Sequence, residues 1–140
     1  MSLEVEAPLP LRVLVVDDQV DSAQSLAALL EAAGFVVATA FDGNQALSVA
    51  DNFRPDLVIS DLEMPEMDGC ELLARLRKRL GPNSKVGYLC LSGSIEPHAR
   101  SRCEEAGFHH FLQKPVGMSE LVQLIRSSEV YGGKALPPGA

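Results

Sequence analysis

The chain has 140 residues, the size of one ordinary globular domain, and leaves no room for a second domain with its own core. Twelve basic and 19 acidic residues give a net charge of −7, which argues against direct binding to nucleic acid. Hydrophobic residues make up 46% of the chain, yet no apolar run approaches the roughly 18 residues that cross a membrane, so we expect a soluble, cytoplasmic protein.

Both ends of the chain have the composition of linkers. Residues 1–10 combine prolines with acidic and small residues, and residues 128–140 are rich in glycine and proline. We therefore expect a single folded domain over residues 11–127, with the first segment a linker or a remnant of a tag and the last a flexible tail.

Five short apolar runs alternate along the chain with segments of helical period. The first run, residues 11–16, is apolar on both faces, as a central parallel strand should be, and is followed by apolar residues spaced three or four apart that end before Gly34. The pattern recurs with strands at residues 35–39, 57–60, 86–91 and 109–112, and with helices at residues 43–52, 69–80, 96–106 and 118–127. This alternation predicts an α/β fold, a doubly wound parallel five-stranded sheet of (βα)5 type with helices on both faces.

Polar residues follow four of the predicted strands, at the sheet edge where open α/β folds bind ligands. They are Asp17, Asp18, Asp61, Ser92 and Lys114. Three carboxylates would repel one another, and one lysine cannot offset them, so this all-oxygen set favours a hard divalent cation such as Mg²⁺. Each residue alone could be a turn former, a helix cap or a solvated side chain, as with residues 92–94 before the predicted helix at 96–106. The joint placement at four strand ends favours a functional site.

Four stretches of this sequence resemble the receiver domain of two-component response regulators, the CheY-like family. They are VLVVDD at residues 13–18, DLVISDLEMPEMDG at 56–69, LSG at 91–93 and FLQKP at 111–115. The third-strand stretch is highly specific, and the resemblance covers nearly all of the predicted domain. It implies a flavodoxin-like strand order of 2-1-3-4-5.

The resemblance also assigns roles by position. It implies that Asp61 is the phospho-acceptor, that Asp17, Asp18, Asp61 and the backbone carbonyl of Glu63 hold Mg²⁺, and that Lys114 and Ser92 contact the phosphoryl group. Phe111 matches the aromatic switch position, and Glu63 and Ser94 match positions that tune the lifetime of the phosphoryl group.

The function that follows is a phospho-accepting receiver rather than a metabolic enzyme. Its expected partners are a histidine kinase or histidine phosphotransfer protein, and a downstream effector protein or an output domain outside this sequence. The domain would catalyse only phosphorylation and dephosphorylation of its own Asp61, switching the surface formed by the fourth helix, fifth strand and fifth helix. No direct contact with nucleic acid or membrane is expected.

Three alternatives remain open from the residues. A phosphatase or phosphotransferase of the haloacid dehalogenase type also uses Mg²⁺ and an aspartate nucleophile, but it would need a DxD arrangement after the first strand. A flavin-binding electron carrier would need an uncharged phosphate loop where Asp17 and Asp18 stand. A degenerate receiver acting only as an interaction module would not need the full acid, hydroxyl and lysine set.

Other potentially reactive residues have simpler interpretations. Cys70, Cys90 and Cys103 are odd in number and lack CxxC spacing, which predicts buried or half-buried free thiols. The three histidines match no zinc motif, so we expect them at or near the surface. Met64 and Met67 are predicted to pack a loop. The basic residues at 75–79 are predicted to form a solvated helix end.

Overall fold

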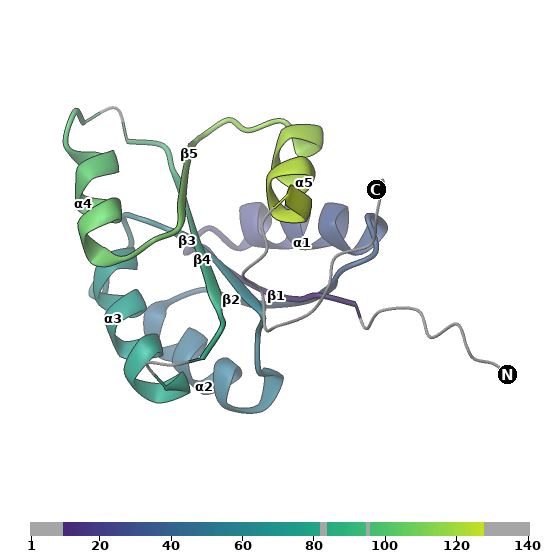
Figure 1. The fold of residues 1–140 in the computed structure, drawn as a ribbon, viewed down its shortest axis with the longest axis horizontal. Coiled ribbons are helices and arrows are strands. Elements are labelled where there is room, and N and C mark those ends of the chain that lie inside the picture. The colour runs from purple at the N-terminus through teal and green to yellow at the C-terminus, as the bar shows by residue number, and fades with distance from the viewer. Residues whose placement is uncertain (1–9, 82–83, 95, 128–140) are drawn as a thin grey trace, which may run out of the picture.

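The computed structural model describes residues 10–81, 84–94 and 96–127 of the chain. Apart from Pro10, the predicted linkers at residues 1–10 and 128–140 lie outside these ranges. The described part of the chain forms a five-stranded sheet flanked by helices (Figure 1).

All neighbouring strands of the sheet pair in parallel, in the order β2-β1-β3-β4-β5. The strands are β1 (Arg12–Val16), β2 (Val36–Ala40), β3 (Leu57–Asp61), β4 (Gly87–Ser92) and β5 (His110–Gln113). The predicted fold class and strand order are therefore confirmed. Every residue of β4 is buried, and so are four of the five in β1 and in β3, because helices cover both faces of these central strands.

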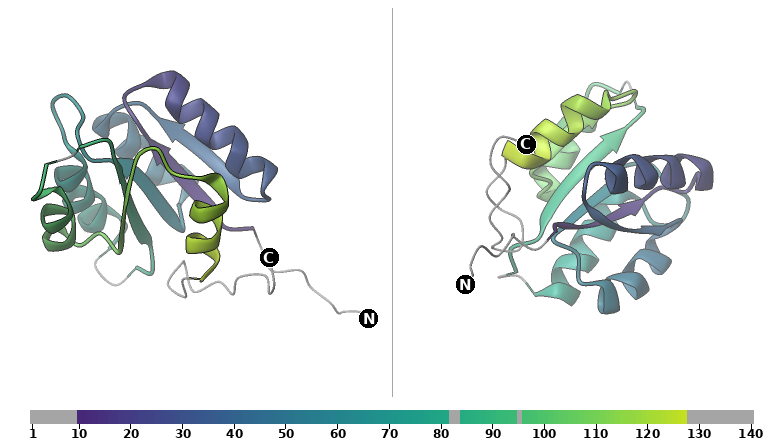
Figure 2. Two further views of the ribbon diagram at one scale, coloured as in Figure 1. Left: turned by 90° about the horizontal axis from the view of Figure 1, so that it is seen from above. Right: turned by 90° about the vertical axis from the view of Figure 1, so that its right-hand side faces the viewer.

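The helices divide between the two faces of the sheet. They are α1 (Val20–Ala32), α2 (Gly43–Phe53), α3 (Gly69–Leu80), α4 (Ala99–Ala106) and α5 (Met118–Ser127). Figures 1 and 2 show α1 and α5 on one face and α2, α3 and α4 on the other. Two apolar clusters match this division, one joining the sheet to α1 and α5 and the other joining it to the remaining three helices.

Local sequence explains where α3 begins and ends. The side chain of Asp68 accepts a hydrogen bond from the backbone N–H of Glu71 at 2.9 Å, which caps the first turn. The last turn carries Arg77, Lys78 and Arg79, whose charge suits the negative end of the helix dipole. Gly81 follows with a φ of 101°, a conformation that glycine adopts without steric cost.

The predicted start of the fourth helix at Glu96 is wrong, because α4 begins at Ala99. The side chain of Ser94 accepts a hydrogen bond from the Glu96 N–H at 3.1 Å, and the Ala99 N–H donates to the Glu96 carbonyl. These bonds close separate turns before the helix, so residues 92–94 do not cap it.

The simpler interpretations of the reactive residues are largely confirmed. Cys90 and Cys103 are buried and Cys70 is half-buried, and all three are free thiols. Met64 and Met67 belong to the apolar core. His98 and His109 are exposed and His110 is half-buried. Among the described residues, no helix is long and apolar enough to span a bilayer.

Candidate functional site

The sheet register brings the predicted site residues to one edge. Val16 pairs with Ser60, so the next residues on these neighbouring strands, Asp17 and Asp61, lie side by side at their carboxyl ends. Asp61 pairs in turn with Leu91, the residue before Ser92. The site is therefore assembled by backbone pairing across the strand-order reversal, where β1 lies between β2 and β3.

Three carboxylates form the centre of the site. One oxygen from each of Asp17, Asp18 and Asp61 lies within 4.8 Å of the other two. Asp17 is buried, Asp61 is half-buried and Asp18 is exposed, so the cluster opens toward solvent on the side of Asp18. Three oxygen ligands at this spacing fit a hard divalent cation.

Lys114 supplies the positive charge within the cluster. Its Nζ lies 3.2 Å from Oδ2 of Asp17 and 3.6 Å from Oδ1 of Asp61. The Lys114 side chain is 34% exposed, whereas the Asp17 and Asp61 side chains are 10% and 14% exposed. Among the described residues, one ammonium stands against three carboxylates, so the cluster is short of positive charge, as a cation site is before the ion binds.

The environment of Asp61 disfavours its ionised form. Burial raises the pKa of Asp61 above its ordinary 3.8, and the negative charges of Asp17 and Asp18 add to this rise. Lys114 and the Leu62 N–H, which donates to Oδ1 at 3.0 Å, oppose it. Among the described residues no donor reaches Oδ2, so this oxygen is available to a ligand or an incoming electrophile.

A close backbone contact fixes the loop that follows Asp61. The Gly69 N–H donates to the Leu62 carbonyl at 2.7 Å. A Cβ atom at Gly69 would lie 2.5 Å from the carbonyl oxygen of Asp61, so only glycine fits here. Glu63 lies within this loop with its side chain exposed.

Ser92 lies at the carboxyl end of β4 with its side chain fully buried. Its Oγ accepts a hydrogen bond from the Ser94 N–H at 3.0 Å, which leaves the hydroxyl proton free to donate. The Lys114 N–H donates to the Ser92 carbonyl at 2.7 Å, joining the ends of β4 and β5. Gly93 has open space where a Cβ would stand.

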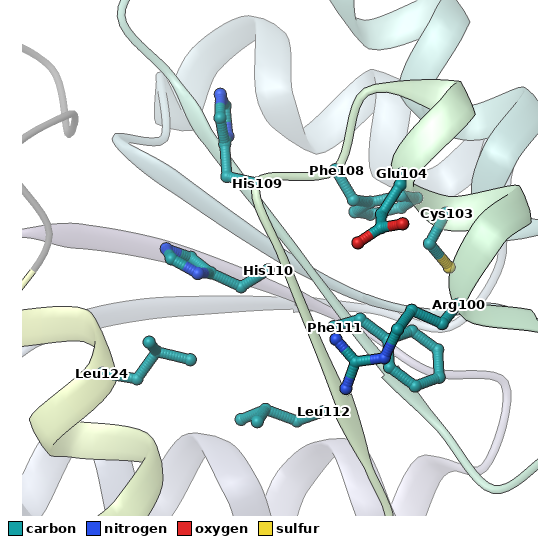
Figure 3. Close-up of a pocket in the computed structure, with 9 residues that line it drawn as sticks. All are labelled: Arg100, Cys103, Glu104, Phe108, His109, His110, Phe111, Leu112 and Leu124. Carbon is teal, nitrogen blue, oxygen red and sulfur yellow. The ribbon is translucent and has the colours of Figure 1, made fainter.

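Phe111 lies on β5 and is half-buried. The guanidinium carbon of Arg100 lies 5.0 Å from the centre of its ring, a cation–π contact (Figure 3). Both residues line a cavity of about 200 Å³ between α4, β5 and α5. The sequence gives no signal for the Arg100 contact, because the two residues are eleven positions apart on different elements.

The comparisons with known proteins agree with this geometry. The model of the response regulator receiver domain family matches residues 13–126. The transcriptional regulatory protein PrrA of Mycobacterium tuberculosis is 39% identical over 116 residues, which are 83% of this chain and 48% of that protein. An uncharacterized 14.6 kDa protein of Leptolyngbya boryana is 35% identical over 91% of this chain and 94% of its own length. The chain thus spans about half the length of PrrA and nearly all of the second relative.

Solved structures show the same fold. The chemotaxis protein CheY4 of Vibrio cholerae superposes with a TM-score of 0.76 at 30% identity, covering 84% of this chain and 98% of that one. A signal receiver domain of a histidine kinase from Syntrophus aciditrophicus gives 0.74 at 30% identity, covering 83% and 87%. With its family model, its relatives and its fold in agreement, this chain belongs to the response regulator receiver domain family of two-component signalling.

Proposed function

We propose that this receiver accepts a phosphoryl group on Asp61 from the phosphohistidine of a histidine kinase or a histidine phosphotransfer protein. The observation that carries the proposal is the cluster of Asp61 with two further carboxylates and the Lys114 ammonium. Membership of the receiver family adds support, and it disfavours the phosphatase and flavin-carrier alternatives, which belong to other families.

Mg²⁺ is the cation that this cluster fits best. Asp17, Asp18 and Asp61 offer hard oxygen ligands, the described part of the site supplies one ammonium against three carboxylates, and the backbone carbonyl of Glu63 is the proposed fourth protein ligand. Mg²⁺ commonly keeps several waters and takes few carboxylates, which suits a cluster with one exposed member. When bound, Mg²⁺ neutralises charge on the oxygens of the transferring phosphoryl group.

The protein's own residues orient the transfer. An oxygen of the Asp61 carboxylate attacks phosphorus, the P–N bond to the donor histidine breaks, and the imidazole keeps that electron pair and takes up a proton. Lys114, which contacts Asp61 before transfer, is placed to pair with a phosphoryl oxygen afterwards. Ser92 has a hydroxyl proton to donate to another phosphoryl oxygen.

We further propose that phosphorylation is reported through Phe111. Movement of the Ser92 hydroxyl toward the phosphoryl group would vacate space, and the ring of Phe111 would turn inward, breaking its contact with Arg100. Phe111 has no hydroxyl, so burying its ring leaves no polar group unsatisfied. The face formed by α4, β5 and α5 would then change shape for a downstream effector or output domain. We place these exchanges in the cytoplasm, where a kinase partner obtains ATP.

Phosphorylation by acetyl phosphate tests the proposal without a partner kinase. The intact mass of the wild type should rise by one phosphoryl group when both acetyl phosphate and Mg²⁺ are present, and the Asp61→Asn variant should show no rise. Asp21→Asn is the matched control, because Asp21 is an exposed aspartate of the first turn of α1, outside the cluster. A missing adduct in the wild type, or undiminished labelling of Asp61→Asn, would overturn the assignment.

A beryllofluoride complex tests the switch separately. Beryllofluoride bound at Asp61 mimics a phosphoryl group, and a structure of the complex should show Ser92 drawn toward the site and Phe111 turned inward. If Phe111 keeps its contact with Arg100 in that complex, the proposed switch is wrong even though phosphorylation can still occur.

A further inference from the structure

A polar cavity lies at the end of the sheet where the strands begin, opposite the end that carries the acid cluster. It has a volume of about 260 Å³ and lies where β4 begins, whereas Ser92 ends the same strand. Its polar lining among the described residues consists of Arg77, Ser84, Lys85, Tyr88 and His109. The other described lining residues are a glycine and a valine, so no acidic residue is among them.

Arg77 holds a positive charge at this cavity without a carboxylate partner among the described residues. Its guanidinium donates to the Gly107 carbonyl at 2.8 Å and lies 5.4 Å from the centre of the Tyr88 ring. By contrast, Arg75 pairs with Glu71 and Arg79 pairs with Asp51. The prediction that the basic residues of α3 form only a solvated helix end is therefore wrong for Arg77, which is half-buried and crosses to the end of α4.

His109 contributes a hydrogen-bond donor. Its Nδ1 accepts a hydrogen bond from the Tyr88 N–H at 3.0 Å, so the neutral ring carries its proton on Nε2. His109 is exposed as a whole, but partial desolvation of its ring lowers its pKa, and Arg77 and His110 add to this, which favours the neutral form. Figure 3 shows the His109 ring turned away from Phe111 and Arg100. Among the described residues, nothing accepts a hydrogen bond from Nε2.

Among the described residues, Tyr88 is the one whose buried side-chain polar atom lacks a hydrogen-bond partner. It is 2% exposed, and its hydroxyl makes no hydrogen bond with the described residues. Its ring stacks on His109 with the centroids 6.1 Å apart. Burial raises the pKa of Tyr88 to about 12, so the hydroxyl stays protonated and can donate. An unsatisfied buried hydroxyl lowers the stability of the native state, and a hydrogen bond to a ligand, or to the protein after a small movement of the side chain, would restore it.

We propose that this cavity binds the phosphate group of a small anionic ligand. Its lining offers two permanent positive charges, on Arg77 and Lys85, and a free donor on His109, with no carboxylate among the described lining residues to compete. The Ser84 hydroxyl already donates to the Gly81 carbonyl at 2.9 Å. A phosphate dianion matches the two charges, and its tetrahedral oxygens accept from several directions. This suits donors on α3, on the segment before β4 and on the residue before β5. Since the cavity holds the volume of roughly nine waters at ~30 Å³ each, it has room for an organic group attached to the phosphate.

Two titrations monitored by amide NMR test the proposal, one with inorganic phosphate and one with glycerol 3-phosphate. Both are done without Mg²⁺ and at constant ionic strength. We expect saturable shifts at Arg77, at residues 84–88 and at residues 107–109. Equal affinities for the two probes would identify free phosphate as the ligand class, and tighter binding of the ester would identify a phosphate monoester. Both results support the site. Shifts that grow without saturation, or that occur only around Lys114, would overturn it.

Charge variants make the test specific. Lys85→Gln and Arg77→Gln should each weaken binding by about tenfold or more, the usual effect of losing a charge-assisted hydrogen bond. Lys85 is exposed and pairs with no described carboxylate, so its variant keeps the fold even if Arg77→Gln loosens α4. Lys78→Gln is the matched control, because Lys78 is the exposed neighbour of Arg77 and does not line the cavity. Equal affinity of Lys85→Gln and the wild type would overturn the proposal.

Discussion

The contact between Gly69 and the end of β3 gives a sharp prediction about stability. In a Gly69→Ala variant the added Cβ would meet the Asp61 carbonyl oxygen at 2.5 Å and the Leu62 Cα at 3.1 Å. Both are backbone atoms, so no side-chain rotation can relieve the clash, and the loop after the phospho-acceptor must move. Overpacking costs about 1–3 kcal/mol, and we expect the upper end, about 3 kcal/mol, because the obstacle is backbone.

Thermal unfolding measures this cost against a matched control. For a chain of this size about 3 kcal/mol corresponds to a fall in Tm of roughly 10 °C. Gly93→Ala also adds one methyl group near the site, but no atom of the described residues lies within 4 Å of its Cβ position, so its Tm should stay within about 2 °C of the wild type. Equal Tm values for Gly69→Ala and Gly93→Ala would refute the reasoning.

Three further predictions concern charge and thiols. Without divalent cations, Asp61→Asn should unfold at a higher Tm than the wild type at neutral pH, because the raised pKa of Asp61 penalises its ionised form in the native state. The native state then binds more protons than the unfolded state as the pH rises from 3.8 through the native pKa, so wild-type stability falls across this window, and the two Tm values should converge below pH 3.8. A difference that does not change with pH would contradict this. Adding Mg²⁺ should raise the wild-type Tm, because the free energy of unfolding grows by about 1.4 kcal/mol for each tenfold excess of Mg²⁺ over its Kd. Asp18→Asn should lose most of this rise in Tm, and Asp21→Asn should keep it. Equal rises in all three proteins would count against the cation site. A thiol reagent at pH 8 should modify Cys90 and Cys103 only as fast as the protein opens, because burial raises the pKa of both thiols, whereas rapid labelling of these two residues in the native protein would argue against their burial.

Much of the fold follows from patterns that the sequence displays directly. Apolar runs on both faces predict covered parallel strands, and the observed β1 and β3 differ from the predicted ranges by a single residue at one end. The third helix agrees at both ends, because Asp68 and Gly81 mark its limits chemically. The fourth helix is predicted less well, since Ser94 and Glu96 have helix-start chemistry but use it in turns before Ala99.

The position of the site can be predicted from the sequence because it follows from the strand pattern. The individual side-chain contacts in and around it cannot. Parallel strands place all their carboxyl ends at one edge, so the residues that follow them must gather there. Side-chain contacts between elements carry no comparable signal. The charge pattern of α3 is the same for Arg77 and Lys78, yet Arg77 reaches Gly107 just after α4 and Lys78 is exposed. Likewise, nothing in the spacing of Arg100 and Phe111 indicates that they touch.

Identification of the modified residue tests the central claim most directly. After incubation with acetyl phosphate and Mg²⁺, borohydride reduction converts an aspartyl phosphate into homoserine, which peptide mass spectrometry locates in the chain. We expect homoserine at position 61 and at neither of the neighbouring acids, Asp17 and Asp18. Asp61 contacts Lys114 and has an Oδ2 that no described donor reaches. Both oxygens of Asp17 already accept hydrogen bonds, and no described cation pairs with Asp18. Homoserine at another aspartate, or at none, would contradict the assignment of this protein as a receiver that is phosphorylated on Asp61.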